Sequence, residues 1–95
     1  MTKEKIYPPS KKITKNTLMN EESYQALYKE SIENPIVFWE REAKKLEWMR
    51  PFTKIKDISY KKDDLHIKWF SDGEINVCFN CVDRHLPTKA NQIAI

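Results

Sequence analysis

The sequence is unusually poor in glycine, because only Gly73 is present among its 95 residues. Loops that cradle phosphate groups need several glycines so that the backbone can approach the ligand closely. The shortage therefore excludes a P-loop and a dinucleotide-binding fingerprint from this chain. No apolar run is long enough to span a bilayer, and the charged N-terminus lacks the apolar region of a signal peptide. We therefore expect a cytoplasmic chain without a membrane partner, whose cysteines are reduced thiols.

The positive charge is confined to one end of the chain. Residues 1–20 hold five lysines against one glutamate, whereas residues 21–95 hold twelve basic against thirteen acidic side chains. A nucleic-acid module concentrates lysine and arginine on one face beside stacking aromatic residues. The remainder of the chain is nearly neutral, so we expect no nucleic-acid partner.

Two helices are predicted after a polar arm. Residues 1–19 contain Pro8-Pro9 and no helical periodicity, which predicts an extended arm. The first helix begins near Asn20, and its apolar stripe consists of Tyr24, Leu27, Tyr28 and Ile32. Asn34 as N-cap and Pro35 at the first position start the second helix, which ends before Pro51. Its apolar face consists of Ile36, Trp39, Ala43 and Leu46, and Glu40 forms an i,i+4 pair with Lys44 on the wet side.

The C-terminal half predicts strands followed by a helix. Leu65–Phe70 alternates as a strand does, with Leu65, Ile67 and Trp69 on one side, and residues 55–60 are a candidate partner strand. Lys61-Lys62 followed by Asp63-Asp64 favours a solvated turn, and Ser71-Asp72-Gly73 predicts another. A third helix is expected from Asn76 to Leu86, before Pro87. The fold class is therefore α+β, and the apolar end, Ile93-Ala94-Ile95, resembles a core strand that stops, which indicates a fragment truncated at Ile95.

The pair Cys78 and Cys81 forms a C-x-x-C motif that invites a chemical interpretation. An unbroken third helix would place Cys78, Cys81, Val82 and His85 on one face. A structural zinc site needs four ligands, and here the fourth would have to be His66 or a carboxylate. A thioredoxin-like motif follows the first strand of a βαβ unit, whereas two helices come first in this chain. We therefore favour two buried thiols on a packing helix over a zinc or redox site.

Other candidate residues also have structural interpretations. Asp83-Arg84-His85 lacks a nucleophile, which favours an ion pair and a partnered histidine over catalysis. Glu40 and Glu42 diverge on a helix because they are two positions apart. Trp39, Trp48 and Trp69 lie on apolar faces, which favours packing over base stacking.

Three stretches together resemble the N-terminal region of the acetyl-coenzyme A synthetases, the AMP-forming acetate–CoA ligases of the adenylate-forming superfamily. The stretches are YPPS, ESYQALYKESIENPIVFWEREAKKLEWMRPF and KWFSDGEINVCFNCVDRHL. The most specific residues are Phe38-Trp39, Trp69-Phe70 with Gly73, and Asn76, Asn80, Asp83, Arg84 and His85. The family commonly has a small residue at the position of Cys78 and often leucine at Val82, so the C-x-x-C motif is a local departure from its pattern.

The resemblance implies a structural role for this segment. The family joins acetate and ATP into acetyl-adenylate with magnesium and then transfers the acetyl group to coenzyme A. Its phosphate loop, acetate pocket and adenylation lysine correspond to sequence after Ile95, so we expect no catalytic, cofactor-binding or metal residue here. Residues 20–95 would form a cap on the remainder of the large N-terminal domain, and the isolated fragment would self-associate. The alternatives are the same region of a propionate or acetoacetate CoA ligase, or a stand-alone helical interaction module.

Overall fold

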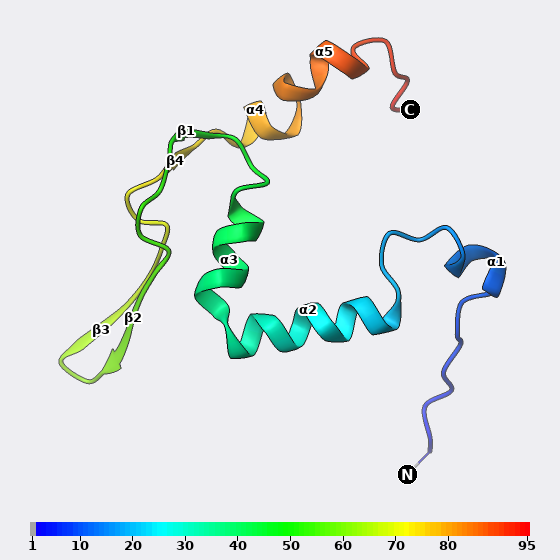
Figure 1. The fold of residues 1–95 in the computed structure, drawn as a ribbon, viewed down its shortest axis with the longest axis horizontal. Coiled ribbons are helices and arrows are strands. Elements are labelled where there is room, and N and C mark those ends of the chain that lie inside the picture. The colour runs from blue at the N-terminus through cyan, green and yellow to red at the C-terminus, as the bar shows by residue number, and fades with distance from the viewer. Residues whose placement is uncertain (1) are drawn as a thin grey trace. The chain divides into compact units, whose positions relative to one another are not determined.

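The computed structural model describes residues 2–95, and the chain divides into two units between Glu33 and Asn34. The first unit contains the helices α1 (Lys11–Thr14) and α2 (Glu21–Glu33). The second contains the helix α3 (Pro35–Ala43), four short strands and three short C-terminal helical segments (Figure 1). The prediction of an α+β fold is confirmed. The division into an arm over residues 1–19 and a cap over residues 20–95 stays a prediction.

The first unit has one helix that the sequence predicted and one that it did not. α2 begins with a reciprocal cap, in which Ser23 N–H donates to Asn20 Oδ1 (2.8 Å) and Asn20 N–H donates to Ser23 Oγ (2.9 Å). α1 lies within the predicted extended arm, where that prediction is wrong. The carbonyl of Ser10 accepts hydrogen bonds from Ile13 and Thr14, and a single helical turn of this kind needs no apolar periodicity.

α3 follows the prediction at its start and is shorter than predicted at its end. Pro35 lies in the first turn and Asn34 is the N-cap residue, although the Asn34 side chain makes no capping hydrogen bond. The helix ends at Ala43, so Leu46 lies beyond it. Ala43 is the buried apolar residue of the helix, and the Glu40–Lys44 pair forms at 2.8 Å as predicted.

The strands form two nested antiparallel pairs. The predicted hairpin is confirmed as β2 (Lys56–Lys61) and β3 (Asp64–Trp69), joined by a two-residue turn, with Lys56 opposite Trp69 and Ile58 opposite Ile67. The segments that flank the hairpin pair as β1 (Trp48–Arg50) and β4 (Glu74–Ile75). This second pair was not predicted, because strands of three and two residues are too short to show a period. Figure 1 shows the hairpin extending from the end of the β1–β4 pair.

An aromatic cluster holds the two pairs together. The ring centroids of Trp48, Phe52 and Phe70 lie 4.8–5.5 Å apart. Phe70 has a φ of 49°, and its carbonyl accepts a hydrogen bond from Gly73 N–H (3.0 Å), which closes the predicted turn. A Cβ atom at Gly73 would lie 2.7 Å from Trp48 Cζ3. The only glycine of the chain is therefore used where the backbone packs against an indole ring.

The aspartate of this turn ties it to the segment after β1. The Asp72 carboxylate accepts hydrogen bonds from the hydroxyl and N–H of Thr53 and from the N–H of Lys54. The hydrogen bond from the Thr53 hydroxyl has the largest effect, and together these hydrogen bonds lower the pKa of Asp72 to about 2.

The predicted third helix is interrupted. Asn76 is its N-cap as predicted, because Phe79 N–H donates to Asn76 Oδ1 (3.0 Å), and α4 (Val77–Cys81) follows. Val82, with φ −125° and ψ −67°, leaves the helical conformation and separates α4 from the 3₁₀ segment η1 (Asp83–His85) and from α5 (Leu86–Lys89). Pro87 lies in the first turn of α5 rather than beyond the end of a helix, because proline is tolerated in a first turn. Residues 91–95 are exposed and form no strand in the described structure, so the expectation of a core strand there is wrong.

None of the helices within residues 2–95 has both the length and the apolar character needed to cross a membrane.

Candidate functional site

The face that would have joined both cysteines to His85 is not formed. Cys81 is the last residue of α4, and the break at Val82 places His85 in a different helical segment. Cys78 and Cys81 are both free and exposed, which corrects the prediction of buried thiols. Among residues 2–95, no group of three or more His, Cys, Asp or Glu side chains is arranged to hold a metal ion.

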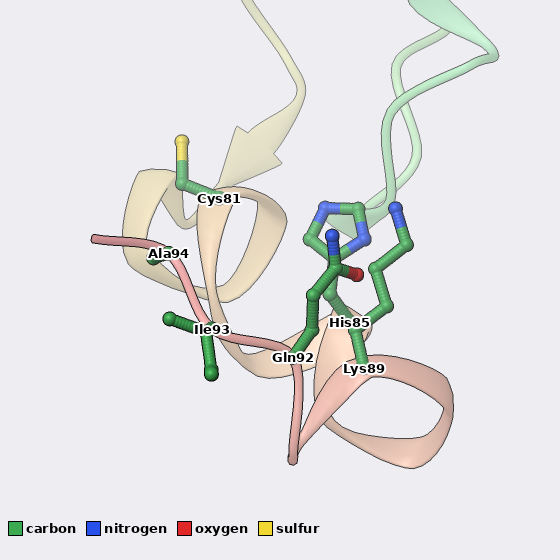
Figure 2. Close-up of a pocket in the computed structure, with 6 residues that line it drawn as sticks. All are labelled: Cys81, His85, Lys89, Gln92, Ile93 and Ala94. Carbon is green, nitrogen blue, oxygen red and sulfur yellow. The ribbon is translucent and has the colours of Figure 1, made fainter.

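A cavity of about 270 Å³ lies beside these residues and is formed partly by the end of the chain. Its lining residues are Cys81, His85, Lys89, Gln92, Ile93 and Ala94. In Figure 2 the side chains of His85 and Lys89 extend in the same direction, whereas the thiol of Cys81 stands apart from them. The cavity therefore does not pair the thiol with the imidazole as a nucleophile and base would be paired.

Asn80 is a buried polar residue whose burial the sequence did not predict. Only 6% of it is exposed. Its amide pairs with the backbone of Glu47: Oδ1 accepts from Glu47 N–H (2.8 Å) and Nδ2 donates to the Glu47 carbonyl (2.8 Å). Nδ2 also donates to the Asn76 carbonyl (3.0 Å). The side chain therefore fixes α4 to the segment that connects α3 with β1.

Arg84 and Trp48 hold the same connecting segment at two further points. Arg84 Nη1 donates to the Lys45 carbonyl (3.0 Å), and Trp48 Nε1 donates to the Ala43 carbonyl (2.8 Å). Arg84 Nε also lies 3.5 Å from His85 Nε2, so the histidine has a side-chain partner, although the sequence did not identify which one. Residues of the most specific part of the resemblance, Asn80 and Arg84, are thus engaged with the backbone of this chain.

The two glutamates of α3 diverge as predicted. Glu40 pairs with Lys44, whereas Glu42 pairs with Lys45 and with Arg41 (3.6 Å). The hydrogen bond from Lys45 is the main cause that lowers the pKa of Glu42.

The three tryptophans pack against other aromatic rings as predicted. Trp48 belongs to the aromatic cluster described above, and Trp39 meets Trp69 edge to face with ring centroids 6.0 Å apart. This second contact connects α3 with the hairpin.

A charged bridge that the sequence interpretation missed crosses one face of the hairpin. His66 Nε2 lies 2.8 Å from Asp57 Oδ1, and His66 Nδ1 lies 3.1 Å from Asp64 Oδ1. Both ring nitrogens can donate only in the imidazolium form, so the hydrogen bond to Asp57, followed by that to Asp64, raises the pKa of His66. The signal was present in the sequence, because the register places the three residues on one face, but it requires the strand pairing to be known.

These features together define a class of protein segment: an α+β unit whose polar contacts hold its own loops in place while several apolar side chains stay exposed. The family model described as "Acetyl-coenzyme A synthetase N-terminus" matches residues 24–81. The chain therefore belongs to the acetyl-coenzyme A synthetase N-terminal family, as its sequence resemblance implied.

Curated relatives match nearly all or all of the chain. The acetyl-coenzyme A synthetase of Shewanella amazonensis is 45% identical over 95 residues, which are 100% of this chain and 15% of the relative. The acetyl-coenzyme A synthetase of Bartonella quintana is 48% identical over 92 residues, 97% of this chain and 14% of the relative. That of Rhizobium rhizogenes is 47% identical over 92 residues, with the same two shares of 97% and 14%. The chain thus matches the N-terminal region of a ligase family and spans about 15% of the length of these relatives.

Proposed function

We propose that this chain is the N-terminal structural segment of a cytoplasmic AMP-forming acetate–CoA ligase. The parent enzyme would make acetyl-CoA from acetate, ATP and coenzyme A through acetyl-adenylate, with magnesium as the metal. The observation that carries the proposal is the match of the whole chain to one region of acetyl-coenzyme A synthetases. This match does not favour a stand-alone interaction module.

The segment itself would contribute structure rather than chemistry. Adenylation needs hydrogen-bond donors and cations aimed at the charge that develops on phosphate. The buried amide of Asn80 and the guanidinium of Arg84 both donate to backbone carbonyls of this chain instead. We propose that none of its residues binds ATP, magnesium or coenzyme A.

The test is acetate-dependent exchange between ATP and pyrophosphate. The protein that carries this segment with the remainder of a synthetase should show exchange with acetate, whereas the purified 95-residue chain should show none. Exchange with propionate or acetoacetate in preference to acetate would replace the proposed substrate. Exchange by the chain alone, unchanged by further purification, would refute its structural role.

A further inference from the structure

The hairpin of β2 and β3 has two chemically opposite faces. Its register places Ile58 opposite Ile67, Tyr60 opposite Leu65, and Trp69 at the far end of the same side. We call these five residues the apolar hairpin face. We infer that the apolar hairpin face is the surface on which the remainder of the synthetase docks. The inference rests on the proposed function and adds to it a definite surface.

The apolar hairpin face is open in the described chain. Tyr60, Leu65 and Ile67 are 77%, 67% and 58% exposed. A two-stranded hairpin is marginally stable in water unless its apolar side is covered by another layer. Within residues 2–95, β2 and β3 form a sheet of two strands only, so the hairpin has no third strand in the described part of the chain.

The exposed surface continues beyond the hairpin. Trp69 meets Trp39 of α3 edge to face, and both indole rings remain about two-fifths exposed. Ile36, which lies three residues before Trp39 on α3, is also exposed. The apolar hairpin face and α3 therefore offer one continuous apolar surface of the kind that marks an interaction site.

The opposite face of the hairpin is suited to water. The bridge of Asp57, His66 and Asp64 crosses it, and Lys61 and Lys68 lie on the same side by register. Lys56 Nζ lies 5.7 Å from the centroid of the Trp69 ring and so marks the end of the apolar side. This two-sidedness orients the hairpin, with one face toward a partner and the other toward solvent.

The occupant that fits is the synthetase body rather than a second copy. The chain covers 15% of the Shewanella amazonensis enzyme, so most of that enzyme lies outside the segment. The first unit exposes an apolar stripe of its own on α2, formed by Tyr24, Tyr28 and Ile32. A twofold contact joins one patch to itself and would leave such a second stripe open, whereas a large body can cover several.

The experiment compares two neighbouring positions of β3 that point to opposite faces. Single cysteines are introduced as Ile67→Cys and Lys68→Cys in a background where Cys78 and Cys81 are serine. Each variant is made in the 95-residue chain and in a chimera, in which this chain replaces the aligned segment of the Shewanella amazonensis synthetase. The rate of thiol labelling by a maleimide is the readout, and acetate-dependent exchange is measured separately on the chimera.

We expect Ile67→Cys to label at least about tenfold more slowly in the chimera than in the chain at a dilution where the chain is monomeric, while Lys68→Cys labels equally fast in both. Equal labelling of Ile67→Cys in both contexts overturns the inference even when the chimera is active. Protection of Ile67→Cys in the 95-residue chain that rises with its concentration, without further protection in the chimera, assigns the surface to a second copy.

The proposed function fails separately, through loss of exchange activity in a chimera whose Ile67→Cys is protected. If the chimera does not fold, the 95-residue chain is added to the synthetase that lacks the aligned segment, and the same two labelling rates are compared. Protection of Ile67→Cys on addition supports the inference, and an unchanged rate overturns it.

Discussion

At the scale of single residues, two positions make close contacts that depend on the size or the chemistry of the residue present. Gly73 leaves room for the Trp48 ring, and Asn80 supplies both a donor and an acceptor to the Glu47 backbone. Each contact joins segments that are far apart in the sequence. Both positions are therefore expected to be sensitive to small substitutions.

Gly73→Ala tests the close approach at Trp48. The added Cβ would lie 2.7 Å from Cζ3 and 3.1 Å from Phe52 Cβ, so the aromatic cluster must shift. We expect a destabilisation of about 1–3 kcal/mol, which is the usual cost of overpacking. Urea unfolding followed by tryptophan fluorescence measures it, with the exposed Ser71→Ala as control in the same turn. Equal unfolding midpoints for the two variants would contradict the prediction.

Asn80→Ala tests the amide pair with Glu47. The substitution removes the side-chain partner of the N–H and carbonyl of Glu47, and each of these part-buried hydrogen bonds contributes about 0.5–1.5 kcal/mol. Asn34→Ala is the matched control, because the Asn34 side chain makes no capping hydrogen bond. Hydrogen exchange at the Glu47 amide should accelerate in the Asn80 variant and stay unchanged in the control. Unchanged exchange in both variants would show that the amide pair contributes nothing.

At the scale of elements, the sequence predicted those with a clear period or a clear start signal. α2, the hairpin and the Asn76 cap were found in this way. It missed β1 and β4, which are too short to show alternation, and it ran one helix through Val82. The burial of Asn80 was missed for another reason: its partner is a backbone group whose position depends on the tertiary fold. No local pattern records such a contact.

The hairpin should be more stable in mild acid than in mild base. The pKa of His66 is raised above 6.5 by Asp57 and then Asp64, so its contribution is complete below about pH 6.5 and is lost as the pH rises through the folded-state value. The pKa of Asp57 is lowered by the same hydrogen bond, so its contribution is lost only as the pH falls below 3.8 toward its folded-state value. Lys68 opposes protonation of the imidazole from the same face, and Ser59 lies directly opposite His66.

An NMR titration of the His66 ring measures this effect. Asp57→Asn should lower the pKa of His66, and His66→Gln should remove the corresponding pH dependence of unfolding. The ring of His85 serves as the internal control, because it lies outside the hairpin. A titration of His66 that is identical in the Asp57→Asn variant would exclude the bridge as its cause.

At the scale of the whole molecule, apolar side chains are exposed on elements of both units. Tyr24, Tyr28 and Ile32 are exposed on α2, whereas Val77, Val82 and Leu86 are exposed near the C-terminus together with Ile93 and Ile95. Only Ala43 among the described apolar residues is classed as buried. A chain of this kind depends on a partner for much of its apolar burial.

The isolated chain should therefore self-associate as its concentration rises. Sedimentation over a wide concentration range should show dimers or larger species, because exposed apolar area is removed from water on association. Ile67→Lys should weaken the association more than Lys68→Ala, since only the first alters the apolar hairpin face. A compact monomer at high concentration that binds no apolar dye would oppose the prediction and strengthen the interaction-module alternative.

The nesting of the β2–β3 hairpin inside the β1–β4 pair also sets an order of folding. The hairpin closes through the two residues Lys62-Asp63, an event of about 1–10 μs in typical hairpins, whereas β1 must find β4 across the whole intervening chain. Closing a longer loop costs more entropy. The β1–β4 pair therefore forms at a lower entropic cost once the hairpin has shortened the effective loop between its strands. Substitutions in the Lys62-Asp63 turn should slow refolding, whereas substitutions in β1 or β4 should mainly accelerate unfolding, as stopped-flow kinetics of dilute protein would show. The hairpin would then nucleate the second unit before Asn80 closes onto Glu47.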